Sequence, residues 1–196
     1  MAKQTTIFTT PVITPLLRGI ARLILRLIGW KIEFHNDRLP YKKCVIIGAW
    51  HTSNWDFALM LVGVLDAEVQ LNWMGKHTIF PKPIAWFMRW LGGIPVNRTR
   101  STNMTSAVAS IFDERDELKI LLAPEGTRST EGGTFKSGFY YIAHQAGVPI
   151  AMAYIDAERK VVGLDKVMET TGDYDKDLAE ILAYYEPYKN KGIKHV

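Results

Sequence analysis

The feature that most constrains the fold is the alternation, after residue 40, of short apolar runs with longer segments of mixed polarity. The runs expected to form strands cover residues 43–48, 69–74, 94–96, 118–122 and 149–155. The segments expected to form helices cover residues 54–65, 83–91, 103–116, 137–146 and 174–185. Such alternation is typical of parallel strands joined by helical crossovers. The sequence therefore predicts an α/β fold, with a mixed, largely parallel sheet flanked by helices.

Residues 14–30, which precede this region, have the periodicity of an amphipathic helix. At 100° per residue, Arg18, Arg22 and Arg26 fall on one narrow face, and most leucines and isoleucines cover the opposite side. Leu25 is the one apolar residue that departs from this division. Three arginines in so short a span argue against a transmembrane helix. A signal peptide is also not expected, since no small-residue cleavage site follows an uninterrupted apolar core.

Two interpretations of this helix remain. It could pack on its own domain with the arginines facing water, or lie in a membrane interface with the arginines at lipid phosphates. Residues 1–50 hold eight Lys or Arg and two acidic residues, whereas the rest of the chain holds 16 basic and 18 acidic residues. This asymmetry indicates an anionic partner for the N-terminal segment, either a membrane or a nucleic acid. The residue pattern alone leaves both interpretations of this helix open, and the α/β domain is expected to follow over residues 41–196.

The first candidate for chemistry is the pair His51 and Asp56, which follows the strand expected at 43–48. Loops at the carboxyl ends of strands are the usual location of ligand sites in α/β proteins. Ser53 is suited to cap the next helix, which leaves His51 in the loop and Asp56 in the first helical turns. The Asp56 carboxylate can then orient the imidazole, which can remove a proton from a hydroxyl. The alternative is a histidine and an aspartate that serve only the start of the helix.

Two other polar groups also follow expected strands. The turn after residues 118–122 combines a glycine with hydroxyl and guanidinium donors, which suits a phosphate. The residues of this turn that we expect to bind are Glu125, Gly126, Thr127 and Arg128. Arg98 follows the strand expected at 94–96 and adds another positive charge. The alternatives are a polar surface turn and a basic loop.

Together and in this order, these groups resemble the motifs of the glycerolipid acyltransferases, typified by bacterial lysophosphatidic acid acyltransferase. The matching blocks are His51 with Asp56, Gly93 to Arg98, Pro124 to Ser129, and Val148 to Ile150. The resemblance covers about residues 44–155. The chain departs from the family pattern at Asn97, where an acidic residue is frequent, and at Ala123, where phenylalanine is usual.

The resemblance implies that residues 41–196 form an acyltransferase domain. Such a domain moves a fatty acyl group from an acyl thioester to the free hydroxyl of lysophosphatidic acid or a related glycerol-phosphate lipid, in phospholipid synthesis. His51 would be the general base and Asp56 its orienting group, while Arg98 and the turn at 125–128 would hold the acceptor phosphate. Acyl-coenzyme A or an acylated acyl carrier protein would be the co-substrate, and no metal or other cofactor is implied.

The resemblance also favours the membrane interpretation, with an N-terminal amphipathic membrane-associating segment over residues 1–40. It further implies peripheral or monotopic attachment to the cytoplasmic face of a membrane that contains anionic phospholipid. Two other functions remain as alternatives. One is a catalytically silent lipid-binding protein of the membrane surface, and the other is an acyltransferase for a different lyso-lipid or an amino-lipid acceptor. Nucleic acid is not an expected partner, since no nucleic-acid motif is present and the leucine-rich face of residues 14–30 would have no role.

Overall fold

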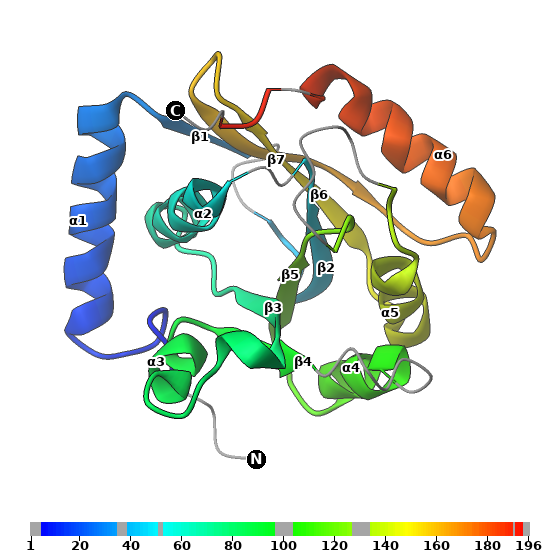
Figure 1. Cartoon of the computed structure of the whole chain (residues 1–196), viewed down its shortest axis with the longest axis horizontal. Helices are drawn as coiled ribbons and strands as arrows, with labels where there is room; N and C mark the ends of the chain where they lie inside the picture. Colours follow the sequence, from blue (N-terminus) through cyan, green and yellow to red (C-terminus); the bar gives the residue numbers. More distant parts are fainter. Residues whose placement is uncertain are drawn as a thin grey trace.

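The computed structural model describes residues 5–34, 39–50, 53–96, 104–126, 134–189 and 191–193. Its centre is a seven-stranded sheet in the order β1-β7-β6-β2-β5-β3-β4 (Figure 1). The strands are β1 (Lys31–Phe34), β2 (Lys43–Gly48), β3 (Asn72–Lys76), β4 (Gly93–Val96), β5 (Leu118–Leu122), β6 (Ile150–Asp156) and β7 (Val161–Met168). The helices are α1 (Ile13–Ile28), α2 (Asn54–Asp66), α3 (Ala85–Trp90), α4 (Met104–Asp113), α5 (Gly138–Ala146) and α6 (Tyr174–Tyr185), with short 3-10 turns η1 (His77–Ile79) and η3 (Glu186–Tyr188).

The sheet is mixed and largely parallel, which confirms the predicted fold class. Strands β6, β2, β5, β3 and β4 run parallel, β7 runs antiparallel to β6, and β1 runs parallel to β7. Strands β2 and β5 have the expected bounds, because continuous apolar runs suit strands that are covered on both faces. Strands β1 and β7 were not predicted. In β7 the register shifts so that Met152 pairs with Lys166 and Ala153 with Leu164, and this bulge breaks the alternation that marks a strand in sequence.

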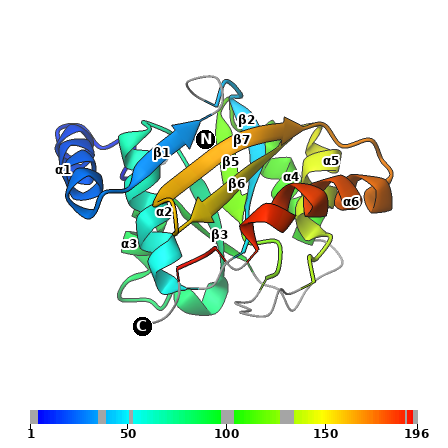
Figure 2. The same cartoon turned by 90° about the horizontal axis from the view of Figure 1, so that it is seen from above.

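Helices cover both faces of the sheet. Figure 1 shows α1, α2 and α3 on one side and α4, α5 and α6 on the other, and Figure 2 shows the two layers from above. A hydrophobic core lies on each face of the sheet, and alternate residues of β2 pack into one or the other. This follows because successive side chains of a strand point to opposite faces. Val45 and Ile47 pack with the α4–α6 side, whereas Cys44 and Ile46 pack with the α1–α3 side.

Helix α1 packs against α2 and turns two of its arginines, not its apolar face, toward the domain. Leu25, the residue that departs from the amphipathic pattern, is 3% exposed and faces the domain, whereas Leu27 is 77% exposed. The other exposed large apolar residues of this helix are Ile13, Leu16, Ile20, Leu23, Ile24 and Ile28. Arg18 and Arg22 form salt bridges of 3.2 and 3.0 Å with Glu68 and Asp66 at the end of α2. The apolar face therefore points outward. Within the described ranges, no helix combines the length and apolar character needed to cross a bilayer.

The connections that follow β2 and β5 cross the sheet in opposite directions. Helices α2 and α3 lead from β2 to β3 and from β3 to β4 over one face, while α4 and α5 lead from β4 to β5 and from β5 to β6 over the other. The neighbours β2 and β5 are therefore followed by helices on opposite faces. Open α/β sheets bind ligands outside the carboxyl ends of strands at such a point. The loops after β2 and β5 are thus placed at the expected site.

Candidate active site

The start of α2 holds Asp56 in place through reciprocal capping. The Ser53 backbone N–H donates to Asp56 Oδ2 at 2.8 Å, and the Ser53 hydroxyl accepts from the Trp55 backbone N–H at 3.2 Å. Both Ser53 and Asp56 are buried. This arrangement satisfies free N–H groups at the helix start, and it restricts the rotamers of Asp56. The carboxylate is therefore positioned beside the end of β2 before any ligand arrives.

The turn after β5 follows the strand that is paired with β2. Gly126 has a φ of 68°, the left-handed conformation that favours glycine, and its N–H donates to the Ala123 carbonyl at 3.1 Å. Glu125, the residue before it, is buried. The side chain of Lys136 lies over the glycine, since an added Cβ at Gly126 would be 2.9 Å from Lys136 Nζ. The turn thus combines a compact backbone with a nearby cation.

The structure describes three of the predicted site residues, namely Asp56, Glu125 and Gly126. It places them at the ends of the adjacent strands β2 and β5. The other four lie outside the described residues and stay predictions; these are His51, Arg98, Thr127 and Arg128.

An apolar pocket of about 500 Å³ lies between α2 and the sheet, and Asp56 is part of its wall. Within the described part of the chain, Asp56 is the only carboxylate or cation in this wall. We call this pocket the trough. Its sheet side is formed by residues of β7, β6, β2, β5 and β3, including Val162, Ala153, Gly48, Leu121 and Trp73. Its other side is formed by Phe57 and Met60 of α2, Ile79 of η1 and Met88 of α3.

The size and lining of the trough suit an acyl chain. Five neighbouring strands span about 19 Å. The hydrocarbon core of a bilayer is about 30 Å thick, so that one acyl chain extends over about 15 Å. The volume also lies within the range of ligand pockets. The trough can therefore hold a fatty acyl chain with its reactive end near Asp56.

Tyr185, the last residue of α6, packs behind the loop that follows β2. Its side chain is fully buried, and its hydroxyl donates to the Ile47 carbonyl at 2.7 Å and lies 3.0 Å from the Ala153 carbonyl. Its own carbonyl accepts from the Trp50 indole N–H at 3.3 Å. Burial and, after it, the charge of Glu125 raise the pKa of Tyr185 well above its usual value, so the phenol stays protonated. Tyr185 thus ties the ends of β2 and β6 to Trp50, the residue before His51.

Sequence reasoning missed Tyr185 and most of the residues that line the trough. Tyr185 follows the last recognised block, Val148 to Ile150, and no motif marks it. The residues that line the trough come from eight elements. In the sequence, its apolar lining residues look like ordinary core residues. The sequence predicted a helix over residues 174–185, but it did not indicate which of its side chains face the domain.

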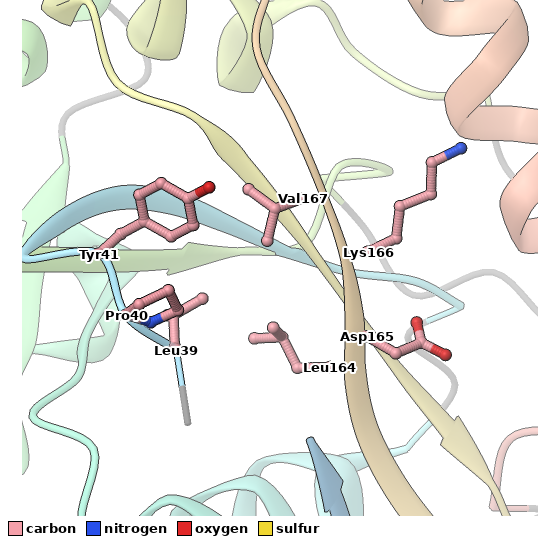
Figure 3. A pocket seen from close by; sticks show the side chains of 7 residues that line it. All are labelled: Leu39, Pro40, Tyr41, Leu164, Asp165, Lys166 and Val167. Atoms are coloured by element: carbon pink, nitrogen blue, oxygen red, sulfur yellow. The ribbon is translucent and has the colours of Figure 1, made fainter. Parts of the chain in front are cut away.

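A smaller cavity of about 290 Å³ lies elsewhere and shares no lining residue with the trough (Figure 3). Leu39, Pro40 and Tyr41 form one wall, and residues 164–167 of β7 form the other. The charged side chains of this wall are engaged with α6, because Tyr184 donates to Asp165 and Lys166 forms a 2.8 Å salt bridge with Glu180. The two charged side chains of this cavity are therefore already paired with residues of α6.

The chain is similar to known proteins over most of its length. The family model described as Acyltransferase matches residues 31–156. The human 1-acyl-sn-glycerol-3-phosphate acyltransferase beta is 28% identical over 163 residues, which are 79% of this chain and 56% of the relative. The 1-acyl-sn-glycerol-3-phosphate acyltransferase of Haemophilus influenzae is 29% identical over 148 residues, 71% of this chain and 60% of the relative. The chain thus spans less than two thirds of the length of these relatives.

A solved structure has the same fold. The crystal structure of the 1-acyl-sn-glycerophosphate acyltransferase PlsC from Thermotoga maritima superposes with a TM-score of 0.58 at 16% identity. The match covers 88% of this chain and 78% of that chain. At this identity the likeness bears on the fold alone.

Proposed function

Since the chain belongs to the Acyltransferase family, whose model matches residues 31–156, we propose that it moves a fatty acyl group from an acyl thioester to a lipid hydroxyl. The acceptor is lysophosphatidic acid or a related glycerol-phosphate lipid, and the reaction belongs to phospholipid synthesis. The single observation that carries this proposal is the position of Asp56, a fixed carboxylate in the wall of an otherwise apolar trough. Such a wall suits an acyl chain, and such a carboxylate suits the orientation of a base.

His51 and Asp56 act together in the proposed reaction. Asp56 accepts a hydrogen bond from one imidazole nitrogen, and the other nitrogen removes the proton of the acceptor hydroxyl. The hydroxyl oxygen attacks the thioester carbonyl, a C–O bond forms, and the C–S bond breaks. The thiolate leaves and takes the proton back from His51. The products are an oxygen ester and a free thiol, and no acyl-enzyme is formed.

The turn after β5 and Arg98 bind the acceptor phosphate in this proposal. The guanidinium groups of Arg98 and Arg128 pair with phosphate oxygens, and Thr127 donates from its hydroxyl. Support for this role comes from Gly126, whose tight turn brings the end of β5 close to Lys136. A phosphate held here fixes the hydroxyl of the same molecule near His51, and catalysis then depends largely on positioning.

The enzyme works on a membrane, and α1 contributes to its attachment. The outward apolar face of α1 fits the acyl region of a bilayer, since interfacial helices bury such a face below the headgroups. Arg26 lies in the last turn of α1 and is available to lipid phosphates, whereas Arg18 and Arg22 pair with α2. The attachment is peripheral or monotopic, on the cytoplasmic face.

The test is a thiol-release assay with the purified chain. The wild-type protein is given a long-chain acyl thioester, on coenzyme A or on acyl carrier protein. The acceptors are a panel of lysophospholipids and amino-lipids on anionic vesicles. We expect turnover with lysophosphatidic acid and a loss of about 10²- to 10⁴-fold in His51→Ala. His144→Ala is the matched control, because His144 lies on the exposed side of α5 and hydrogen-bonds Thr170. Its turnover should equal that of wild type.

The other outcomes of this assay separate the alternatives. Turnover with an amino-lipid acceptor alone would support acyl transfer and contradict the proposed glycerol-phosphate acceptor. Vesicle binding with no thiol release from any acceptor would overturn the enzyme and favour a silent lipid-binding protein. Equal rates in wild type and His51→Ala would overturn the role of His51.

A further inference from the structure

The segment from Lys76 to Leu91, which contains η1 and α3, has an unusual surface. No acidic residue occurs between Glu68 and Asp113, so the whole region is basic or neutral. Trp86 is 68% exposed, and the exposed fractions of Ile79, Ile84 and Phe87 range from 40% to 46%. Exposed aromatic and aliphatic groups interleaved with cations are typical of a surface that meets an anionic bilayer.

The cations of this segment differ from the arginines of α1 in their salt bridges. Lys76, Lys82 and Arg89 are exposed, and none of them forms a salt bridge with any residue that the structure describes. The arginines Arg18 and Arg22 of α1 differ in this respect, because each pairs with an acid at the end of α2. The positive charge of the η1–α3 segment is therefore free to meet anionic headgroups.

The segment is firmly anchored although its outer side is exposed. Phe80 is buried and stacks on Trp73 with ring centroids 5.5 Å apart. The Trp73 indole N–H donates to the Leu91 carbonyl at 3.0 Å, and the Trp90 indole N–H donates to the Thr10 hydroxyl at 2.9 Å. The last contact joins α3 to the residues that lead into α1. The two exposed apolar surfaces are therefore connected through this stretch.

The inner side of the same segment belongs to the trough. Ile79 and Met88 line it together with Asp56. Ile79 is also 44% exposed, so one side chain lies both at the outer surface and in the pocket wall. A lipid bound at Trp86 and Phe87 would thus be one helical turn or less from the trough.

We propose that the η1–α3 segment, residues 76–91, docks on an anionic bilayer and forms the portal through which an acyl chain passes into the trough. The role of the portal rests on the proposed function, because the portal would admit the acyl chain that the site transfers. Docking by itself requires no turnover. The two ideas can therefore fail separately.

The test places one fluorescent probe at a time on the surface. Cys44 is the only cysteine of the chain and is fully buried, and burial raises the pKa of its thiol to about 12, so an introduced cysteine is labelled selectively. Ile84→Cys reports on the portal, and Leu182→Cys on the exposed side of α6 is the matched control. Leu23→Cys reports on α1. Each labelled protein is mixed with phosphatidylglycerol–phosphatidylcholine vesicles that carry nitroxide-labelled acyl chains, which quench a probe that enters the bilayer.

The expected result is strong quenching at Ile84 and at Leu23, and little at Leu182. Quenching at Leu23 without quenching at Ile84 would overturn the portal and leave α1 as the docking element. Equal quenching at Ile84 and Leu182 would overturn it as well, because the binding would then be unspecific. A quenched Ile84 probe in a chain that shows no acyl transfer would keep the docking surface and overturn the proposed function instead.

Charge removal provides an independent measurement. Each basic side chain at an anionic surface strengthens binding about fivefold, so Lys82→Ala with Arg89→Ala should weaken vesicle binding by about 25-fold. The matched control removes two exposed lysines from the α6 side, Lys176→Ala with Lys189→Ala. Equal weakening in both double variants would mean that only net charge matters, and would contradict a docking role for residues 76–91.

Discussion

The hydroxyl of Tyr185, in the last turn of α6, lies 2.7 Å from the carbonyl oxygen of Ile47 in β2, 138 residues earlier in the chain. The Acyltransferase match ends at residue 156, so this contact ties the C-terminal helix to the part of the domain that the family shares. The backbone of the same tyrosine binds Trp50, which directly precedes His51. Helix α6 therefore supports the loop that carries the proposed base.

We predict that Tyr185→Phe lowers kcat by roughly ten- to a hundredfold, because small displacements of a catalytic group have large effects on rate. The KM values for donor and acceptor should stay close to wild type, since Tyr185 is absent from the wall of the trough. Tyr184→Phe is the control, because it removes a hydroxyl that binds Asp165 instead of the end of β2. Equal losses of kcat in both variants would contradict a positioning role for Tyr185.

Asp56→Asn should separate the charge of this residue from its place in the helix. An asparagine oxygen can still accept from the Ser53 N–H, so we expect a melting temperature within a few degrees of wild type. Loss of the carboxylate that orients the base should lower kcat by about 10²- to 10⁴-fold. Asp66→Asn, at the far end of α2, removes only a surface salt bridge and should be active. Full activity of Asp56→Asn would contradict the proposed mechanism.

Gly48→Ala should change the chain-length preference. An added Cβ would lie 3.6 Å from Leu121 Cδ1, an ordinary contact, so the fold can accept the methyl group. The methyl group would occupy the floor of the trough, and long acyl chains should lose roughly tenfold in kcat/KM relative to short ones. Gly138→Ala at the start of α5, where nothing lies within 4 Å, is the control. An unchanged ratio of long-chain to short-chain turnover would place the acyl chain elsewhere.

Two leucines of α1 should have opposite roles. Leu25→Ala removes a buried side chain and should lower the free energy of unfolding by about 2–5 kcal/mol. Leu27→Ala changes an exposed side chain, so its unfolding free energy should stay within about 0.5 kcal/mol of wild type. Its partition into anionic vesicles should fall by roughly tenfold or more, because apolar area would be lost from the docking face. Chemical denaturation and vesicle co-sedimentation measure the two effects, and the opposite assignment would contradict the orientation of α1.

Asp177 gives the fold an acid-sensitive contact. Burial alone would raise the pKa of its carboxyl, but hydrogen bonds from the Thr171 N–H and hydroxyl and from the Tyr140 hydroxyl, at 2.7 to 2.8 Å, lower the pKa below its usual value. Since the folded pKa is below the unfolded one, the stabilisation is present above about pH 4 and is lost as the pH falls through the folded pKa. Asp177→Asn should lower the unfolding free energy by about 2–3 kcal/mol at pH 7 and weaken this pH dependence. Denaturation of both proteins between pH 2 and pH 7 measures it, and parallel curves would contradict the prediction.

Much of the fold was predictable from local sequence. The bounds of β2, β5 and α6 follow directly from runs and periodicities that depend on neighbouring residues. Strand β3 forms at 72–76 instead of the expected 69–74, because the Val69 N–H donates to the Val64 carbonyl at the end of α2 and does not pair in the sheet. Strand β7 was not predicted because its bulge at Asp165 interrupts the alternation of apolar and polar residues. Strand β1 was not predicted because four residues are too few to show such an alternation clearly.

The sequence by itself determined which chemical groups follow which strands: His51 and Asp56 after β2, and Glu125 to Arg128 after β5. Only the tertiary structure decided that β2 and β5 are neighbours, and that Asp56 faces an apolar trough assembled from eight elements. It also decided that Leu25, and not the leucine stripe, faces the domain. Periodicity is a local property and shows that a helix has two faces. Which face is covered depends on the partner that long-range packing brings to it.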